Sequence, residues 1–103
     1  MAKTRLELHA ALEEFMGNKN VYFQPPESFK IKYPCIIYDF DRVDQVYADN
    51  TTYLMNDKYV ITVIYREADA TYKHDLLRAF NSIRYDRHYK SENLYHDVFT
   101  IVW

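Results

Sequence analysis

Residues 58–67 constrain the fold most, because they predict a strand that must lie inside a sheet. Alternate residues of a strand point to opposite faces of the sheet. One face of this segment carries Tyr59, Ile61, Val63 and Tyr65, and the other carries Val60, Thr62 and Ile64. Both faces are therefore apolar or ambivalent, as is typical of a strand with neighbours on both sides. We expect this segment at the centre of its sheet.

Two segments predict helices. The first, residues 4–16, opens with a capping box of Thr4 and Glu7 and ends before Gly17, which adopts the left-handed conformation without steric cost. The second is expected to follow Asp69 as its N-cap and to end at Asn81. Their apolar stripes repeat at three- and four-residue spacing and comprise Leu8, Ala11, Leu12 and Phe15 in the first helix, and Tyr72, Leu76, Leu77 and Phe80 in the second.

Four further segments, residues 21–24, 35–40, 83–89 and 94–103, read as strands, with a turn at 90–93. The element order α-β-β-β-α-β-β predicts an α+β fold in which two helices pack on a largely antiparallel sheet. A chain of 103 residues is the size of a single domain, which we expect to span residues 1–103.

Residues 41–57 separate two of the expected strands. A structureless loop of this length is uncommon in a compact domain unless it has a function. The segment contains Asp41, Asp44, Asp49 and Asp57, and apolar residues lie between them. We expect it to extend the flanking strands into a long, projecting β-hairpin arm with its tip at residues 48–51.

The composition excludes several classes of function. A formal charge of −2 does not fit a generally basic nucleic-acid coat protein. With Gly17 as its only glycine, the chain holds no glycine-rich phosphate-binding loop. Cys35 is the only cysteine, so no internal disulfide forms, and its apolar neighbours predict a buried, reduced thiol.

We also expect a cytoplasmic, soluble protein. Charged residues interrupt the first twelve positions, so no signal-peptide apolar region is present there. The longest strongly apolar stretch, residues 59–65, is far shorter than the roughly 20 residues of a membrane helix.

The histidines form the one candidate metal or acid–base cluster. His88 and His96 are expected on neighbouring strands near diagonal positions, with Asp97 beside them. A metal or hydrolytic site needs three or more groups aimed at one point, and no motif supplies them. We favour surface histidines, no enzyme activity, no metal and no cofactor, and keep a small metal-dependent enzyme using these three residues as an alternative.

Basic and aromatic residues interleave near the C-terminus. Arg84, Tyr85, Arg87 and Tyr89 form a mixture that can stack bases and contact phosphates, so a single-stranded nucleic-acid module is another alternative. Residues 58–90 carry seven basic and four acidic side chains, whereas residues 35–57 carry one basic and five acidic. A subunit with an acidic and a basic side can join copies of itself head to tail into a ring. A solvated surface that has no partner explains the same separation of acidic and basic residues.

Several long segments together resemble small structural proteins of long-tailed bacteriophages: the minor capsid, head–tail joining or tail terminator proteins. The resemblance covers residues 4–103, and its specificity comes from the ordered set of segments, none of which is a catalytic motif. The segments are residues 20–28 (NVYFQPPES), 32–38 (KYPCIIY), 47–50 (YADN), 59–64 (YVITVI), 86–89 (DRHY) and 93–100 (NLYHDVFT).

The resemblance implies a tail terminator, which forms a hexameric ring at the head-proximal end of the tail tube, ends tail polymerisation and joins tail to head. Its implied partners are further copies of itself, the tail tube protein and a head connector or stopper protein. DNA passes through the ring without specific binding. The implied location is the virion, in the neck of the tail, after assembly in the host cytoplasm. The alternative within the virion is a head-completion connector or stopper ring, one ring nearer the head.

The resemblance supplies no residue-level functional motif, so the site hypotheses come from the residues themselves. A channel that lets DNA pass without holding it needs an acidic lining, which repels phosphates. We therefore expect Asp41, Asp44, Asp49 and Asp57 to face the channel or the tube. The subunit interface is expected to contain Arg84, Tyr85, Arg87 and Tyr89.

Overall fold

The computed structural model describes residues 4–26 and 30–103, and for residues 46, 48 and 52–54 it describes the backbone alone. Glu27 and Ser28, which end one of the phage-like segments, lie outside the described residues. The elements in chain order are α1 (Arg5–Met16), β1 (Val21–Phe23), β2 (Cys35–Ala48), β3 (Thr51–Tyr65), α2 (Tyr72–Ala79), β4 (Ile83–Ser91) and β5 (Leu94–Val102).

The strands form one five-stranded sheet in the order β1-β2-β3-β5-β4. β1 pairs with β2 in parallel, and every other pair is antiparallel. The predicted α+β class, the element order and the largely antiparallel sheet are therefore confirmed. The segment expected at the centre of the sheet lies in β3, which pairs with β2 on one side and β5 on the other.

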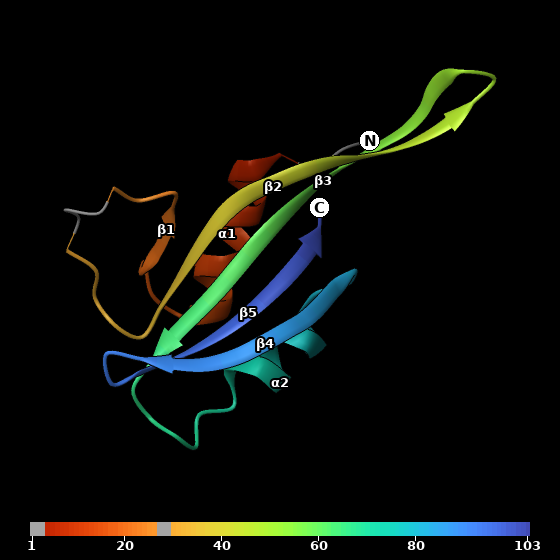
Figure 1. Ribbon diagram of the computed structural model, residues 1–103. Coiled ribbons are helices and arrows are strands. Elements are labelled where there is room, and N and C mark those ends of the chain that lie inside the picture. The colour runs from red at the N-terminus through yellow and green to blue at the C-terminus, as the bar shows by residue number, and fades with distance from the viewer. Residues whose placement is uncertain (1–3, 27–29) are drawn as a thin grey trace.

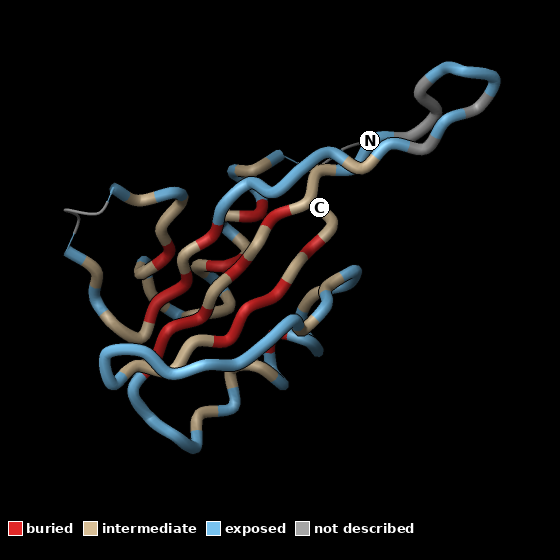
Figure 2. The backbone as a smooth tube through the Cα atoms, viewed as in Figure 1, coloured by how far each residue is buried: buried red, intermediate tan, exposed pale blue. Residues whose placement is uncertain are grey.

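Both helices lie on the same side of the sheet, α1 behind β2 and β3 and α2 behind β4 and β5 (Figure 1). The core forms between them and the sheet, and buried stretches follow the middle of β2, β3 and β5 (Figure 2). Leu8 and Leu12 of α1 and Leu76 of α2 are fully buried there against Ile61 and Val63 of β3. We call this side of the sheet the helix face and the other side the open face.

The first helix forms as its sequence predicts. The Glu7 amide donates to Thr4 Oγ1 at 3.2 Å, and the Thr4 amide donates to Glu7 Oε1 at 3.3 Å. Gly17 ends the helix with φ of 73°, in the left-handed region. This capping box satisfies amides that the first helical turn leaves without intrahelical partners.

The prediction for the second helix is wrong at both ends. Its N-cap is Thr71, because a turn in which the Ala70 amide donates to the Glu67 carbonyl occupies the residues around Asp69. The helix ends at Ala79, two residues before Asn81. Leu77, expected to point inward, is instead 38% exposed.

The arm is present, and its strands are longer than the expected segments 35–40 and 58–67. β2 and β3 continue past the neighbouring strands to a turn at Asp49 and Asn50, with φ of 53° and 63°. Such a two-residue turn matches the twist of a hairpin, and Asp and Asn tolerate its positive φ angles. The arm projects beyond the rest of the domain (Figure 1). With the arm included, the extents of the chain are 51 × 27 × 24 Å.

Cys35 is fully buried at the start of β2, as predicted. Its burial raises the pKa of the thiol to about 12, so the reactive thiolate is scarce at neutral pH. Neither α1 nor α2, the helices of the described residues, is long and apolar enough to cross a membrane.

Candidate functional site: the arm, the edge strand and a helix groove

The two faces of the arm differ in chemistry. A bulge at Asp41 shifts the β2 register, so that Phe40 pairs with Tyr59 but Arg42 pairs with Lys58 and Val43 with Asp57. From Met55 to Tyr65 the odd-numbered residues of β3 lie on the helix face, which therefore continues along the arm. Val43, Gln45 and Tyr47 of β2 alternate onto the same side, before and after a second register shift between Val46 and Tyr47. We call this continuation the apolar arm face, and its exposed apolar residues are Phe40, Val43, Tyr47 and Met55.

The opposite side of the arm is charged. Lys58 Nζ lies 2.9 Å from Asp44 Oδ2, and Arg42 Nε lies 3.8 Å from Asp44 Oδ1. These side chains are partly exposed, so the ion pairs contribute little stability. This face, with Asp44 at its middle, is the charged arm face.

The structure does not bring the four predicted channel aspartates together. Asp44 lies on the charged arm face, Asp41 is the bulged residue and Asp49 is in the tip turn. Asp57 lies at the base of the apolar arm face, where its carbonyl accepts a hydrogen bond of 2.8 Å from the Trp103 amide. The carboxylates are thus spread along the arm and make it acidic as a whole.

Three of the four predicted interface residues share the open face of β4. Arg84 Nε donates to Asp86 Oδ1 at 2.8 Å, the Arg87 guanidinium lies 5.1 Å from the centre of the Tyr89 ring, and Tyr89 stacks on His96 with centroids 4.6 Å apart. Tyr85 lies on the helix face, opposite Phe99. A bulge between Tyr85 and Arg87 causes this separation.

Asp86 anchors this bulge. Thr100 Oγ1 donates to its Oδ2 at 2.6 Å. Burial alone would raise the pKa of Asp86, but the hydrogen bonds from Thr100 and Arg84 and the charges of Arg84 and Arg87 outweigh burial and lower it.

We predict that the stability supplied by the Asp86 carboxylate depends on pH. Because its pKa is lower in the folded chain than its ordinary 3.8, wild type should exceed Asp86→Asn in unfolding free energy above about pH 4. This advantage should disappear as the pH falls through the folded-state pKa. Urea unfolding of both proteins between pH 2 and 6 measures it. Thr100→Val removes one donor to Asp86, so in that background the pH-dependent difference in unfolding free energy between the chains with Asp and with Asn at position 86 should be smaller. A difference that stays constant at every pH contradicts the prediction.

A buried carboxylate occupies the helix face near the end of the sheet. Asp97 is fully buried and accepts three hydrogen bonds: from Tyr65 Oη at 2.7 Å, from Tyr85 Oη at 3.1 Å and from His88 Nδ1 at 2.6 Å. Burial, and then the bond to Asp97, raise the pKa of Tyr65, so its hydroxyl remains a donor. Sequence reasoning missed this cluster, although Asp97 alternates with the apolar Tyr95, Phe99 and Ile101 of the last strand.

The three residues of the enzyme alternative do not share one point. His88 pairs with Asp97 on the helix face, whereas His96 pairs with Tyr89 on the open face. The prediction of neighbouring strands is confirmed, but the one-residue offset sends the two rings to opposite sides. Within residues 4–26 and 30–103, no three His, Cys, Asp or Glu side chains are grouped so that they could hold a metal ion.

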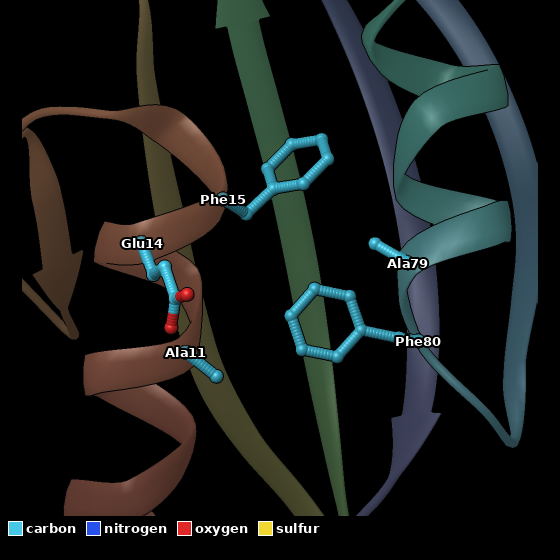
Figure 3. Close-up of a pocket in the computed structure, with 5 residues that line it drawn as sticks. All are labelled: Ala11, Glu14, Phe15, Ala79 and Phe80. Carbon is cyan, nitrogen blue, oxygen red and sulfur yellow. The ribbon is translucent and has the colours of Figure 1, made fainter.

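A groove separates the two helices on the helix face (Figure 3). It has a volume of about 400 Å³ and is lined by Ala11, Glu14, Phe15, Ala79 and Phe80. A second hollow of about 270 Å³ shares Ala79 and Phe80 and continues to Trp103. The Phe15 and Phe80 rings are 6.3 Å apart, as are those of Phe80 and Trp103. Sequence reasoning placed Phe15 and Phe80 in the inward stripes and missed the groove, because helix periodicity does not give the spacing between two helices.

No protein-family model matches this chain, and no curated protein matches it either. The fold itself defines the class: a small α+β domain with a projecting acidic arm, a charged edge strand and an aromatic groove. Surfaces of this kind, which combine aromatic and arginine side chains, are typical of protein–protein association.

Proposed function

We propose that this protein is a structural component of a long-tailed bacteriophage that forms a ring at the head-proximal end of the tail tube. The ring ends tail polymerisation and joins tail to head, without enzyme activity or cofactor. The observation that supports this proposal best is the acidic arm, which projects from a domain whose edge strand β4 carries Arg84 and Arg87 on its open face. The ordered segments that resemble head–tail joining and tail terminator proteins point the same way.

The proposed mechanism is steric and associative. A protein that stops a growing polymer binds its end and presents a different surface to the next subunit. The arm and the β4 edge are structurally distinct, so each copy has two different sides. When the same contact repeats from copy to copy, the copies close into a ring if the rotation between neighbours adds up to a full turn. The finer assignment, a hexamer in the neck of the virion, follows from the resemblance.

In the proposed ring, the acidic and the basic surfaces of each copy meet different partners. The acidic arm, with Asp41, Asp44, Asp49 and Asp57, faces the channel or the tube, where carboxylates repel DNA phosphates and let the genome pass. The basic open face of β4, with Arg84 and Arg87, contacts a neighbouring copy together with Tyr89. Tyr85 supports this strand from the helix face through its bond to Asp97.

Purified protein mixed with tail tubes that lack heads tests the proposal. We expect the protein to remain on one end of each tube. The tubes should then not lengthen when more tube protein is added, and electron microscopy of tube lengths measures this. Binding to filled heads but not to tubes would instead support the connector or stopper alternative. Binding to neither would overturn the phage-neck proposal.

A further inference from the structure

We infer that two copies of the free chain pair face to face, each covering the open face of the other, around a two-fold axis that runs parallel to the strands. This contact is a second one between copies, beside the contact of the proposed ring, and it does not depend on the tail function. It assigns a partner to the side of the sheet that both helices leave uncovered.

The first observation is the chemistry of the open face. In the described part of the chain, no helix lies on this face (Figure 1). An antiparallel sheet with one uncovered face usually carries polar residues there, but the middle of this face is apolar or β-branched. Val98 is buried, and the half-buried residues around it are Ile37, Val60, Thr62 and Thr100. Branched side chains of this kind suit the inner faces of two sheets that pack on each other.

The second observation is the distribution of charge across this face. The strand register aligns residues in rows that cross the sheet from β2 to β4. One row consists of Asp39, Val60, Thr100 and Arg84, and the next row of Ile37, Thr62, Val98 and Arg87. Asp39 is exposed, and the Arg84 side chain is 72% exposed. Each copy therefore presents an aspartate at one edge of the apolar patch and two arginines at the opposite edge.

A two-fold axis parallel to the strands brings these opposite charges together. It lays β4 of one copy over β2 of the other and keeps each row at the same height, so Arg84 lies over Asp39 of the second copy, twice in the pair. Sheets that pack in an aligned way lie about 10 Å apart and cross at about 30°, a separation that an arginine and an aspartate side chain span together. Arg84 already donates to Asp86 at 2.8 Å, but a guanidinium has further donors for a second carboxylate.

The same charges disfavour the other face-to-face arrangement. An axis perpendicular to the strands lays β4 over β4, so that the arginines of the two copies meet, and like charges placed together at an interface are unfavourable. The parallel axis avoids this contact. It also lets the two arms point in the same direction from opposite edges of the pair.

The size of the patch predicts a weak dimer. β3 and β5 pair along Lys58–Tyr65, which is about 27 Å of strand, and the four strands β2, β3, β5 and β4 span about 14 Å. A surface of this size is at the low end for specific interfaces. Because pairing covers Arg84 and Arg87, a copy has to leave the pair before it enters the proposed ring.

An exchange of charges tests the pairing. Asp39→Arg and Arg84→Asp are prepared as separate variants; both positions are exposed, so the fold should survive, and urea unfolding checks this. Sedimentation equilibrium at low salt and high protein concentration measures dimerisation. We expect each variant alone to dimerise about tenfold more weakly than wild type, because arginine then faces arginine, or aspartate faces aspartate. An equimolar mixture should form a mixed dimer with an affinity close to that of wild type, and native mass spectrometry identifies it by its mass.

Glu14→Arg and Lys19→Asp are the matched controls. They make the same charge changes at exposed positions on α1 and before β1, away from the open face. Neither control should weaken dimerisation. The inference is overturned if the mixture of Asp39→Arg and Arg84→Asp dimerises no better than each variant alone, or if wild type stays monomeric at these concentrations. Recovery only in assemblies larger than two copies also overturns it, because that result indicates a head-to-tail contact.

Asp39→Arg also separates this pairing from the proposed ring, which does not use Asp39. We expect this variant to cap tail tubes as wild type does, although it fails to dimerise. A wild-type chain that dimerises as expected but leaves tubes growing keeps the pairing and loses the tail function. A wild-type chain that caps tubes but does not dimerise keeps the tail function and loses the pairing.

Discussion

Replacement of Asp97 by alanine is expected to lower the free energy of unfolding by about 3–5 kcal/mol, a large part of the stability of a domain of this size. The variant leaves the hydroxyls of Tyr65 and Tyr85 and the ring nitrogen of His88 without their acceptor. Tyr65 is 1% exposed, so water cannot readily replace the lost carboxylate. Urea unfolding followed by circular dichroism measures the change.

Two matched variants make this result specific. Asp75→Ala removes an aspartate whose side chain is 51% exposed, and we expect a loss within about 1 kcal/mol. Tyr65→Phe removes one donor from the cluster and should cost about 1–2 kcal/mol. If Asp97→Ala costs no more than Asp75→Ala, the buried cluster does not anchor the hairpin of β4 and β5.

Reversal of both arginines on the open face, Arg84→Glu with Arg87→Glu, should weaken self-association about a hundredfold at low salt. The change replaces positive by negative charge on the surface proposed to contact a neighbouring copy, and a charge of the wrong sign at an interface can cost several kcal/mol. Sedimentation velocity over a range of concentrations and salt measures the effect. The salt dependence of wild-type association should also be lost, because screening acts mainly on exposed charges.

The double variant Lys19→Glu with Lys32→Glu is the control. It changes the net charge by the same amount at exposed positions beside β1, on the opposite edge of the sheet. We expect little effect on association. Equal weakening by both double variants would indicate a general effect of net charge and would remove β4 from the interface.

These two predictions concern opposite faces of the hairpin that β4 and β5 form. Arg84 and Arg87 act on the open face, whereas Tyr85 and His88 hold Asp97 on the helix face. We expect the arginine variant to lose association but keep its unfolding free energy. We expect Asp97→Ala to lose unfolding free energy more than association. Measurement of both quantities on both variants separates assembly from folding.

Local sequence was sufficient for the first helix, the central strand and the class of fold. The Thr4 and Glu7 capping box and Gly17 mark α1 because each acts on neighbouring backbone groups, and the alternation in β3 reports burial on both sides. It was sufficient also for the arm, because apolar residues occur on both sides of a turn that Asp49 and Asn50 form readily. The start of the second helix was placed two residues too early, because a turn ending near Ala70 competes with the Asp69 cap.

Only the tertiary structure decided which side chains meet across the sheet and between the helices. Single-residue bulges at Asp41 and Asp86 shift the strands that carry them, so Tyr85 is separated from Arg87 and the helix face continues along the arm. The cluster around Asp97 and the groove between Phe15 and Phe80 join residues far apart in the chain. Periodicity tells which residues of one element share a face, but pairing register and helix spacing depend on contacts between elements.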